Sequence, residues 1–200
     1  MSEERDLAAE FEAAYATTPP WDIGRPQPSF ATLASEGLLA GSVLDVGCGT
    51  GEHVLMAAEA GCEAVGIDIA ATAIHLAEAK ASERGVAARF VVGDALSLGS
   101  LAEQFDTVLD CGLFHVFDDP DRLRFVESLS SVLRPGGRYY MLCFSDDEPP
   151  GWGPRRVTRH EIREAFSNGW VVERIEAAEL HVTIRPESPV KAWLCSIRRS

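Results

Sequence analysis

The sequence predicts an α/β fold in which a mostly parallel sheet carries helices on both faces. From Ser42 onward, short apolar runs alternate with segments of helical periodicity, and this alternation is typical of right-handed βαβ units. A glycine-rich stretch, residues 45–51, follows the first apolar run and precedes a helical segment. Ligands bind beside the carboxyl ends of the strands in such sheets. The 200 residues are 46% hydrophobic, so we expect a single domain with one sizeable core.

The N-terminal part is expected to form two helices joined by a stiff loop. Residues 2–15 predict a helix with Ser2 as its N-cap. Apolar side chains recur at helical spacing along it: Leu7, Phe11, Ala14 and Tyr15. Four prolines interrupt residues 17–28, which makes this loop rigid. A second helix is expected over residues 30–36, capped by Ser29.

The remaining segments predict the sheet and the helices that connect its strands. Short apolar runs indicate five strands in the first part, at 43–46, 64–68, 88–92, 107–110 and 138–144. Helical periodicity between them indicates helices at 52–60, 71–83 and 121–133, the last of which Pro135-Gly136-Gly137 is expected to stop. Thr158 and Glu161 form a capping box at the start of a short helix, 158–166. Two late runs then close the sheet, at 170–175 and 192–198.

The glycine-rich stretch does not match the common phosphate-binding loops. Its glycines stand at 47, 49 and 51, and Glu52 occupies the third glycine position of G-x-G-x-x-G. A nicotinamide-dependent dehydrogenase is therefore disfavoured, and the P-loop lysine is missing as well. Asp45 at the entrance of the loop would repel a pyrophosphate but would attract a ligand that carries a positive charge.

Two further carboxylates are predicted at neighbouring strand ends. Asp68 ends the second expected strand, where a carboxylate can accept both ribose hydroxyls. Asp94 follows the third strand and is placed to accept a hydrogen bond from an adenine amino group. The predicted ligand is an adenosine without phosphates that carries a cationic end.

These residues resemble the class I S-adenosylmethionine-dependent methyltransferases over about residues 40–145. The resemblance is carried by Leu44-Asp45-Val46-Gly47-Cys48-Gly49-Thr50-Gly51, Gly66-Ile67-Asp68, Gly93-Asp94-Ala95 and Leu133-Arg134-Pro135-Gly136-Gly137. It implies a Rossmann-like sheet of seven strands, one of them antiparallel, and a transferase that uses S-adenosyl-L-methionine and releases S-adenosyl-L-homocysteine. It also implies a set of cofactor-binding residues: Asp45, Gly47, Cys48, Gly49, Thr50, Gly51, Asp68, Ile69, Gly93, Asp94, Ala95, Leu96, Asp110 and Cys111.

A narrower resemblance covers the proline-rich loop. Pro19-Pro20-Trp21-Asp22-Ile23-Gly24-Arg25-Pro26 looks like the N-terminal segment of the thiopurine, thiol and halide methyltransferases and of actinobacterial quinone or phenol methyltransferases. In that group the segment folds over the cofactor as a lid. The resemblance implies that Trp21 packs near the methionine end and that Arg25 reaches its carboxylate. Simple helix packing is the alternative for Trp21, and a plain surface charge is the alternative for Arg25.

The loop after the fourth strand, residues 110–115, matches the loop that lines the methyl-transfer site in the same group. His115 is the candidate catalytic base, with a core or rim position as the alternative. Phe114, Phe144 and Trp152 are candidates for an apolar acceptor pocket, and core packing is equally compatible with them.

The chemistry of deprotonation favours an acidic acceptor. Phenols, with a pKa of about 10, and thiols, with a pKa of about 8.5, need only modest help to lose a proton. The expected acceptor is therefore a small molecule with a phenolic, quinol or similarly acidic O–H. A thiol or halide acceptor is the alternative within the same enzyme class. A non-catalytic S-adenosylmethionine-binding module is the alternative of another class.

Composition narrows the expected partners. The net charge of −13 disfavours nucleic acid and anionic membranes, and no apolar run is long enough to span a bilayer. The five cysteines form no C-x-x-C pair, so we expect neither a metal site nor a disulfide framework. We expect a cytoplasmic protein, monomeric or homodimeric, with a lid at 1–36, a cofactor-binding core at 40–145 and a C-terminal part at 146–200.

Overall fold

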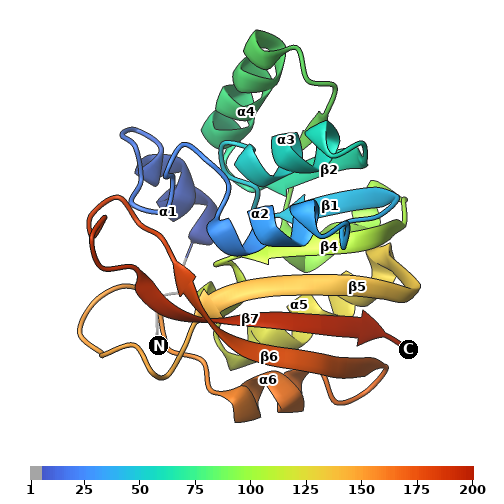
Figure 1. Cartoon of the computed structure of the whole chain (residues 1–200), viewed down its shortest axis with the longest axis vertical. Helices are drawn as coiled ribbons and strands as arrows, with labels where there is room; N and C mark the ends of the chain where they lie inside the picture. Colours follow the sequence, from blue (N-terminus) through green and yellow to red (C-terminus); the bar gives the residue numbers. More distant parts are fainter. Residues whose placement is uncertain (1–5) are drawn as a thin grey trace.

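The computed structural model describes residues 6–200 and contains a seven-stranded sheet of strand order β3-β2-β1-β4-β5-β7-β6. The strands are β1 (Ser42–Val46), β2 (Glu63–Asp68), β3 (Arg89–Val92), β4 (Phe105–Cys111), β5 (Leu133–Phe144), β6 (Trp170–Leu180) and β7 (Val190–Arg199). Strands β1 to β5 pair in parallel, and β7 runs antiparallel to both of its neighbours. The predicted α/β class, the mostly parallel sheet and its one antiparallel strand are confirmed (Figure 1).

Helices cover both faces of the sheet. The helices are α1 (Leu7–Ala14), α2 (Pro28–Ser35), α3 (Glu52–Glu59), α4 (Ala71–Arg84), α5 (Asp119–Val132) and α6 (Arg159–Ala165). One apolar cluster joins one face of the sheet to α5 and α6, and a second joins the opposite face to α2, α3 and α4. Neighbouring residues of β1 divide between the clusters, since Leu44 belongs to the first and Val43 to the second. This is the alternation that a strand buried on both faces requires.

The two N-terminal helices begin at other residues than expected. Helix α1 begins at Leu7 with Asp6 as its N-cap, whose side chain accepts from the Ala9 backbone N–H at 3.0 Å. The expected cap, Ser2, lies outside the described residues. Helix α2 begins at Pro28 after Gln27, and Ser29 is its second residue rather than its cap. Proline suits this first position because it has no N–H to leave unpaired.

Strand β5 begins five residues earlier than predicted, directly after α5. Pro135, Gly136 and Gly137 lie within the strand and do not form a separate stop. The pairing with β4 shifts from Phe105–Leu133 to Thr107–Arg138, so these residues form a bulge. Strands β6 and β7 are also longer than the apolar runs that predicted them. They pair as an antiparallel hairpin, and many residues of β6, the edge strand, are exposed and polar, so the apolar pattern does not mark the full length of the strand. Two short 3₁₀ helices were not predicted: η1 (Ala95–Leu101) and η2 (Phe114–Val116).

The carboxyl ends of the parallel strands meet α1, the N-terminal loop and the loops that follow β5 and β6 at one edge of the molecule, on the left in Figure 1. Gln27 joins two of these segments. Its buried side chain donates to the His181 carbonyl at 2.9 Å and accepts from the His181 N–H at 2.8 Å. The Thr183 N–H also donates to the Pro20 carbonyl at 2.8 Å. Within residues 6–200, no helix combines the length and the apolar character needed to cross a membrane.

Candidate active site

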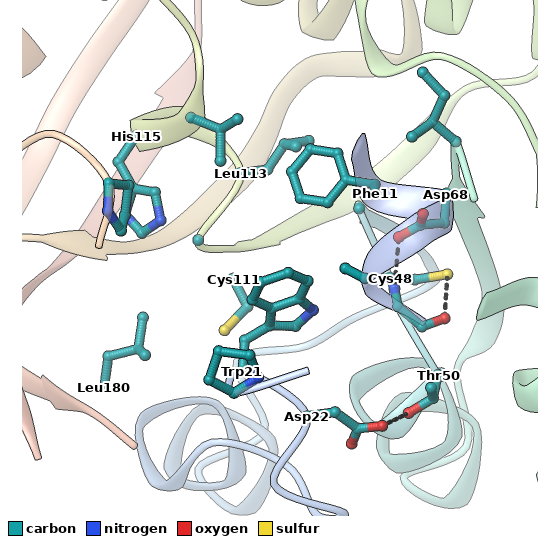
Figure 2. A pocket seen from close by; sticks show the side chains of 18 of the residues that line it. Phe11, Trp21, Asp22, Cys48, Thr50, Asp68, Cys111, Leu113, His115 and Leu180 are labelled. Atoms are coloured by element: carbon teal, nitrogen blue, oxygen red, sulfur yellow. Dashed lines mark hydrogen bonds between the residues drawn. The ribbon is translucent and has the colours of Figure 1, made fainter. Parts of the chain in front are cut away.

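A cavity of about 920 Å³ opens at this edge of the sheet. Ligand pockets commonly measure about 300–1,000 Å³, so this cavity lies at the upper end of that range. Its wall comes from the N-terminal segment, the glycine-rich loop, the ends of β2 and β3, and the loops after β4, β5 and β6. Figure 2 shows Trp21 in the middle, with His115 and Leu180 on one side and Asp68 and Thr50 on the other.

The glycine-rich loop presents bare backbone to the cavity. The N–H groups of Gly47 and Cys48 donate to the Ile67 carbonyl at 2.8 and 3.0 Å, which fixes the loop to the end of β2. Gly49 has a φ of +53°, and a Cβ there would lie 2.8 Å from the Tyr15 hydroxyl. Gly51 has a φ of +85° and precedes α3. Side chains at these positions would meet both backbone strain and close contacts.

Asp68 lies where the loop meets β2 and faces the cavity. Its carboxylate accepts from the backbone N–H groups of Gly49 at 2.8 Å and Ala70 at 2.9 Å. Burial raises the pKa of Asp68, and the two backbone donors oppose that rise. Each carboxylate oxygen keeps a second lone pair, so both can still accept from a diol. Asp94 caps η1 through the Leu96 N–H at 2.8 Å and also lines the cavity.

The N-terminal segment covers the cavity through contacts between aromatic side chains and hydrogen bonds. Trp21 donates to the Tyr15 hydroxyl at 3.2 Å, and its ring lies 5.9 Å edge-on from the ring of Phe11. The Thr50 hydroxyl donates to Asp22 at 2.8 Å and so ties this segment to the glycine-rich loop. Arg25 lines the cavity, is exposed and forms no ion pair with the described carboxylates.

The other half of the cavity is mainly apolar and aromatic. Phe144 packs against Trp152 at 5.4 Å and edge-on against the His115 ring at 4.9 Å. Cys111 and Leu180 complete this wall. The His115 Nδ1 accepts the backbone N–H of Phe144 at 3.0 Å. Burial first, and then the charges of Arg122 and Arg156, lower the pKa of His115 to about 3.

Comparison with known proteins agrees with this geometry. A family model described as a methyltransferase domain matches residues 43–137. The chain is 38% identical over 187 residues to a 2-heptyl-1-hydroxyquinolin-4(1H)-one methyltransferase of Mycobacteroides abscessus, a match that spans 88% of this chain and 82% of that protein. The chain belongs to the class I S-adenosylmethionine-dependent methyltransferases.

Two further similar proteins are described in terms of sulfur chemistry. A probable thiol methyltransferase of Arabidopsis thaliana is 34% identical over 149 residues, which cover 74% of this chain and 66% of that protein. A structure from work on the conversion of a disulfide bond into a thioacetal group during echinomycin biosynthesis superposes with a TM-score of 0.89 and 36% identity. That match covers 97% of this chain and 93% of the other.

The methyltransferase cavity has the features that its cofactor, S-adenosylmethionine, requires. This cofactor supplies a methyl group on a cationic sulfur, which is the electrophile of the reaction. The bare glycine backbone leaves space for a ligand, while Asp22, Asp68 and Asp94 supply negative charge on the same half of the cavity. Arg25 is an exposed cation in the cavity wall that forms no ion pair with the carboxylates of residues 6–200. These groups match a ligand with a diol, a positive centre and a carboxylate.

Asp45 does not line the cavity, although it opens the glycine-rich motif. It lies on the same face of β1 as Val43, below the loop, and is fully buried. Its two oxygens have no hydrogen-bond partner within residues 6–200, and Oδ2 lies 3.7 Å from Nδ1 of His53. His53 accepts the Gln27 N–H through Nε2 at 3.1 Å. Its own proton is therefore on Nδ1, facing the carboxylate.

Three more predicted site residues point away from the cavity. Phe114 is fully buried among core residues and packs on Phe166 at 5.8 Å, so its expected place in the acceptor pocket is corrected. Leu96 packs against the core on the side of α5. Asp110 accepts from the N–H groups of Leu113 and Phe114 and from the Tyr139 hydroxyl. It therefore shapes the 112–115 loop and does not reach the cavity itself.

The other predicted residues do meet at the cavity: Trp21, Arg25, Gly47, Cys48, Gly49, Thr50, Gly51, Asp68, Ile69, Gly93, Asp94, Ala95, Cys111, His115, Phe144 and Trp152. The sequence prediction missed wall residues such as Phe11, Tyr15 and Leu180. Phe11 and Tyr15 belong to the apolar stripe predicted on the first helix, and in the structure this stripe lines the cavity. Leu180 lies at the end of a hairpin strand whose length the sequence did not reveal.

Proposed function

We propose that this methyltransferase transfers a methyl group to an acidic hydroxyl oxygen of a small aromatic acceptor, of the phenol, quinol or N-hydroxyquinolone kind. The name of the Mycobacteroides abscessus relative supports an N-hydroxyquinolone-like acceptor. The aromatic wall formed by Phe144 and Trp152 supports a flat acceptor, since aromatic rings pack favourably on one another.

The observation that carries this proposal is the poor basicity of the acceptor half of the cavity. His115 has a pKa of about 3 and uses Nδ1 to hold the Phe144 backbone. Burial raises the pKa of Cys111 well above its ordinary value, so its thiolate is disfavoured. These groups cannot deprotonate an aliphatic alcohol near neutral pH. An acceptor that ionises readily by itself avoids this difficulty.

The remaining residues are assigned by what they offer to the two ligands. Asp68 accepts the ribose hydroxyls, Asp94 accepts from the adenine amino group, and the glycine-rich loop lets the ligand approach closely. Arg25 pairs with the carboxylate of the methionine part. Trp21 and the N-terminal segment act as a lid that excludes water, which favours a reaction in which opposite charges neutralise.

A thiol acceptor is the second candidate, because the Arabidopsis relative is a probable thiol methyltransferase. Thiols also need little help to ionise. The two candidates differ in the preferred atom, and they can be compared on ring-matched probes such as 4-nitrophenol and 4-nitrothiophenol.

The direct test is a methyl-transfer screen that measures S-adenosylhomocysteine release and the mass of the methylated product. We expect 1-hydroxyquinolin-4(1H)-one and 4-nitrophenol to yield O-methyl products at higher kcat/KM than 4-nitrothiophenol or iodide. Faster turnover of the thiol would assign the chain to the second candidate. Cofactor binding without turnover of any of these probes would contradict both proposed acceptor classes.

A further inference from the structure

We propose that the acceptor binds as its oxyanion, and that the Nε2–H of His115 donates the hydrogen bond that holds this oxygen. This inference rests on the proposed function and adds the ionisation state of the substrate and the residue that selects it. His115 then acts as an anion-binding residue and not as the base expected from the sequence.

Hydrogen bonding fixes the tautomer of His115. The Phe144 backbone N–H can only donate, so the Nδ1 atom that receives it at 3.0 Å must carry a lone pair. The single proton of a neutral imidazole is then on Nε2. Within residues 6–200, no group forms a hydrogen bond with the His115 Nε2. This atom lies beside Gly112, and a Cβ added at Gly112 would be 3.3 Å from Nε2. His115 lines the cavity, so the donor is available to a ligand.

Two guanidinium groups add positive potential around this donor. Arg122 of α5 donates to the Phe114 carbonyl and pairs with Glu161 at 3.2 Å, and its Nη2 is buried without a partner within residues 6–200. Arg156 lies 5.2 Å above the Phe144 ring and donates to the backbone carbonyls of Trp152 and Pro154. It forms no ion pair with the described carboxylates. Both charges disfavour a protonated His115 and favour an anion beside it.

The other ionisable groups near His115 do not change this balance. Cys111 is held neutral by burial. Asp110 is buried, receives three hydrogen bonds from its surroundings and has its pKa raised to about 7. Asp118 lines the cavity but caps α5 through the Asp121 N–H at 2.9 Å. The carboxylates Asp22, Asp68 and Asp94 lie on the cofactor half of the cavity, away from His115.

The transfer step balances without a protein base. A lone pair of the acceptor oxygen forms the new O–C bond to the methyl carbon, while the S–C bond breaks and its electron pair stays on sulfur. One negative and one positive charge disappear, and no proton moves. Acceptors that ionise near neutral pH are therefore selected over weaker acids.

Binding of 4-nitrophenol in the presence of S-adenosylhomocysteine tests this directly, because the phenol and the phenolate absorb at different wavelengths. The titration is made about one pH unit below the solution pKa of the phenol. A hydrogen bond to the charged form of the phenol should lower its pKa by about one to two units on binding. We expect the bound ligand to show the phenolate band. A bound ligand with the spectrum of the neutral phenol would overturn the inference.

A matched pair of variants tests the role of His115. In His115→Gln, the amide oxygen can still accept the Phe144 N–H and the amide N–H₂ can still donate, but no group titrates. His115→Leu removes both functions. We expect His115→Leu to lose the phenolate band and about tenfold to a hundredfold in kcat/KM. We expect His115→Gln to keep the band and at least ten times the kcat/KM of His115→Leu.

Equal losses in the two variants would show that His115 is needed as a base. S-adenosylhomocysteine affinity and melting temperature verify that each variant is folded. If a variant does not fold, the spectrum of 4-nitrophenol bound to the wild-type protein still tests the inference. The outcomes separate the two proposals. If phenols are methylated but bind in the neutral form, only this inference fails. If thiols are methylated and phenols are not, the proposed function fails.

Discussion

The buried side chain of Gln27 forms two of the hydrogen bonds that tie the N-terminal segment to the end of β6, and removing it gives a measurable prediction. In Gln27→Ala, both hydrogen bonds to the His181 backbone are lost. Each contributes about 0.5–1.5 kcal/mol, so the free energy of unfolding should fall by about 1–3 kcal/mol. For a chain of this size, each kcal/mol lowers Tm by about 2–4 °C.

The variant should also lose affinity for S-adenosylhomocysteine, because the segment that it releases carries Trp21, Asp22 and Arg25 into the cavity wall. Ser35→Ala is the control: it removes an exposed side-chain hydrogen bond to the Thr32 carbonyl at 2.9 Å in helix α2 and leaves the tie intact. Urea denaturation and calorimetric titration measure the two effects. If Gln27→Ala matched Ser35→Ala in both its free energy of unfolding and its affinity for S-adenosylhomocysteine, the Gln27 hydrogen bonds would not hold the N-terminal segment in place.

Three other changes test separate parts of the structure. Gly49→Ala should weaken S-adenosylhomocysteine binding at least tenfold in calorimetry, because the added Cβ would lie 2.8 Å from the Tyr15 hydroxyl at a φ of +53°. Gly61→Ala is the control, since Gly61 also has a positive φ, +89°, but no described atom within 4 Å. This control should lose about 1 kcal/mol of stability and keep its affinity for S-adenosylhomocysteine. Trp21→Ala should raise the Kd for S-adenosylhomocysteine several-fold and slow turnover, and unchanged values for both would contradict a lid role. Burial raises the Asp110 pKa from its ordinary value of about 4 to about 7, so its protonated form contributes stability that is fully present below about pH 4 and is lost as the pH rises to about 7. Urea denaturation should therefore show a free energy of unfolding that falls between about pH 4 and 7, and this fall should be absent in Asp110→Asn.

The positions of the parallel strands and most of the cofactor half could be predicted because each depends on local sequence. Apolar runs located the parallel strands, and glycines at 47, 49 and 51 located the loop because their conformations exclude side chains. The bulge at Pro135 to Gly137 was not predictable, because proline and glycine usually end an element and only the pairing with β4 keeps them in the strand.

The acceptor half was harder to predict because His115 lies in the short 3₁₀ helix η2, where no periodic pattern shows which side chains face the cavity. Phe114 and His115 are adjacent in sequence, yet one enters the core and the other lines the cavity. The resemblance implies that Asp110 binds the cofactor, but both of its carboxylate oxygens accept backbone N–H groups in the tight turn after β4. The histidine tautomer depends on a contact with Phe144, 29 residues away, which no local pattern reveals.

Cofactor binding at the glycine-rich half of the cavity is expected to depend on the Asp68 carboxylate. Calorimetric titration of the wild-type chain and of Asp68→Ala with S-adenosylhomocysteine tests this in one experiment. We expect one site per chain in the wild type and an affinity at least tenfold weaker in the variant, since a charged acceptor of hydrogen bonds is lost. The absence of binding heat in the folded wild type over a range of temperatures, or equal affinities in the two proteins, would contradict this expectation.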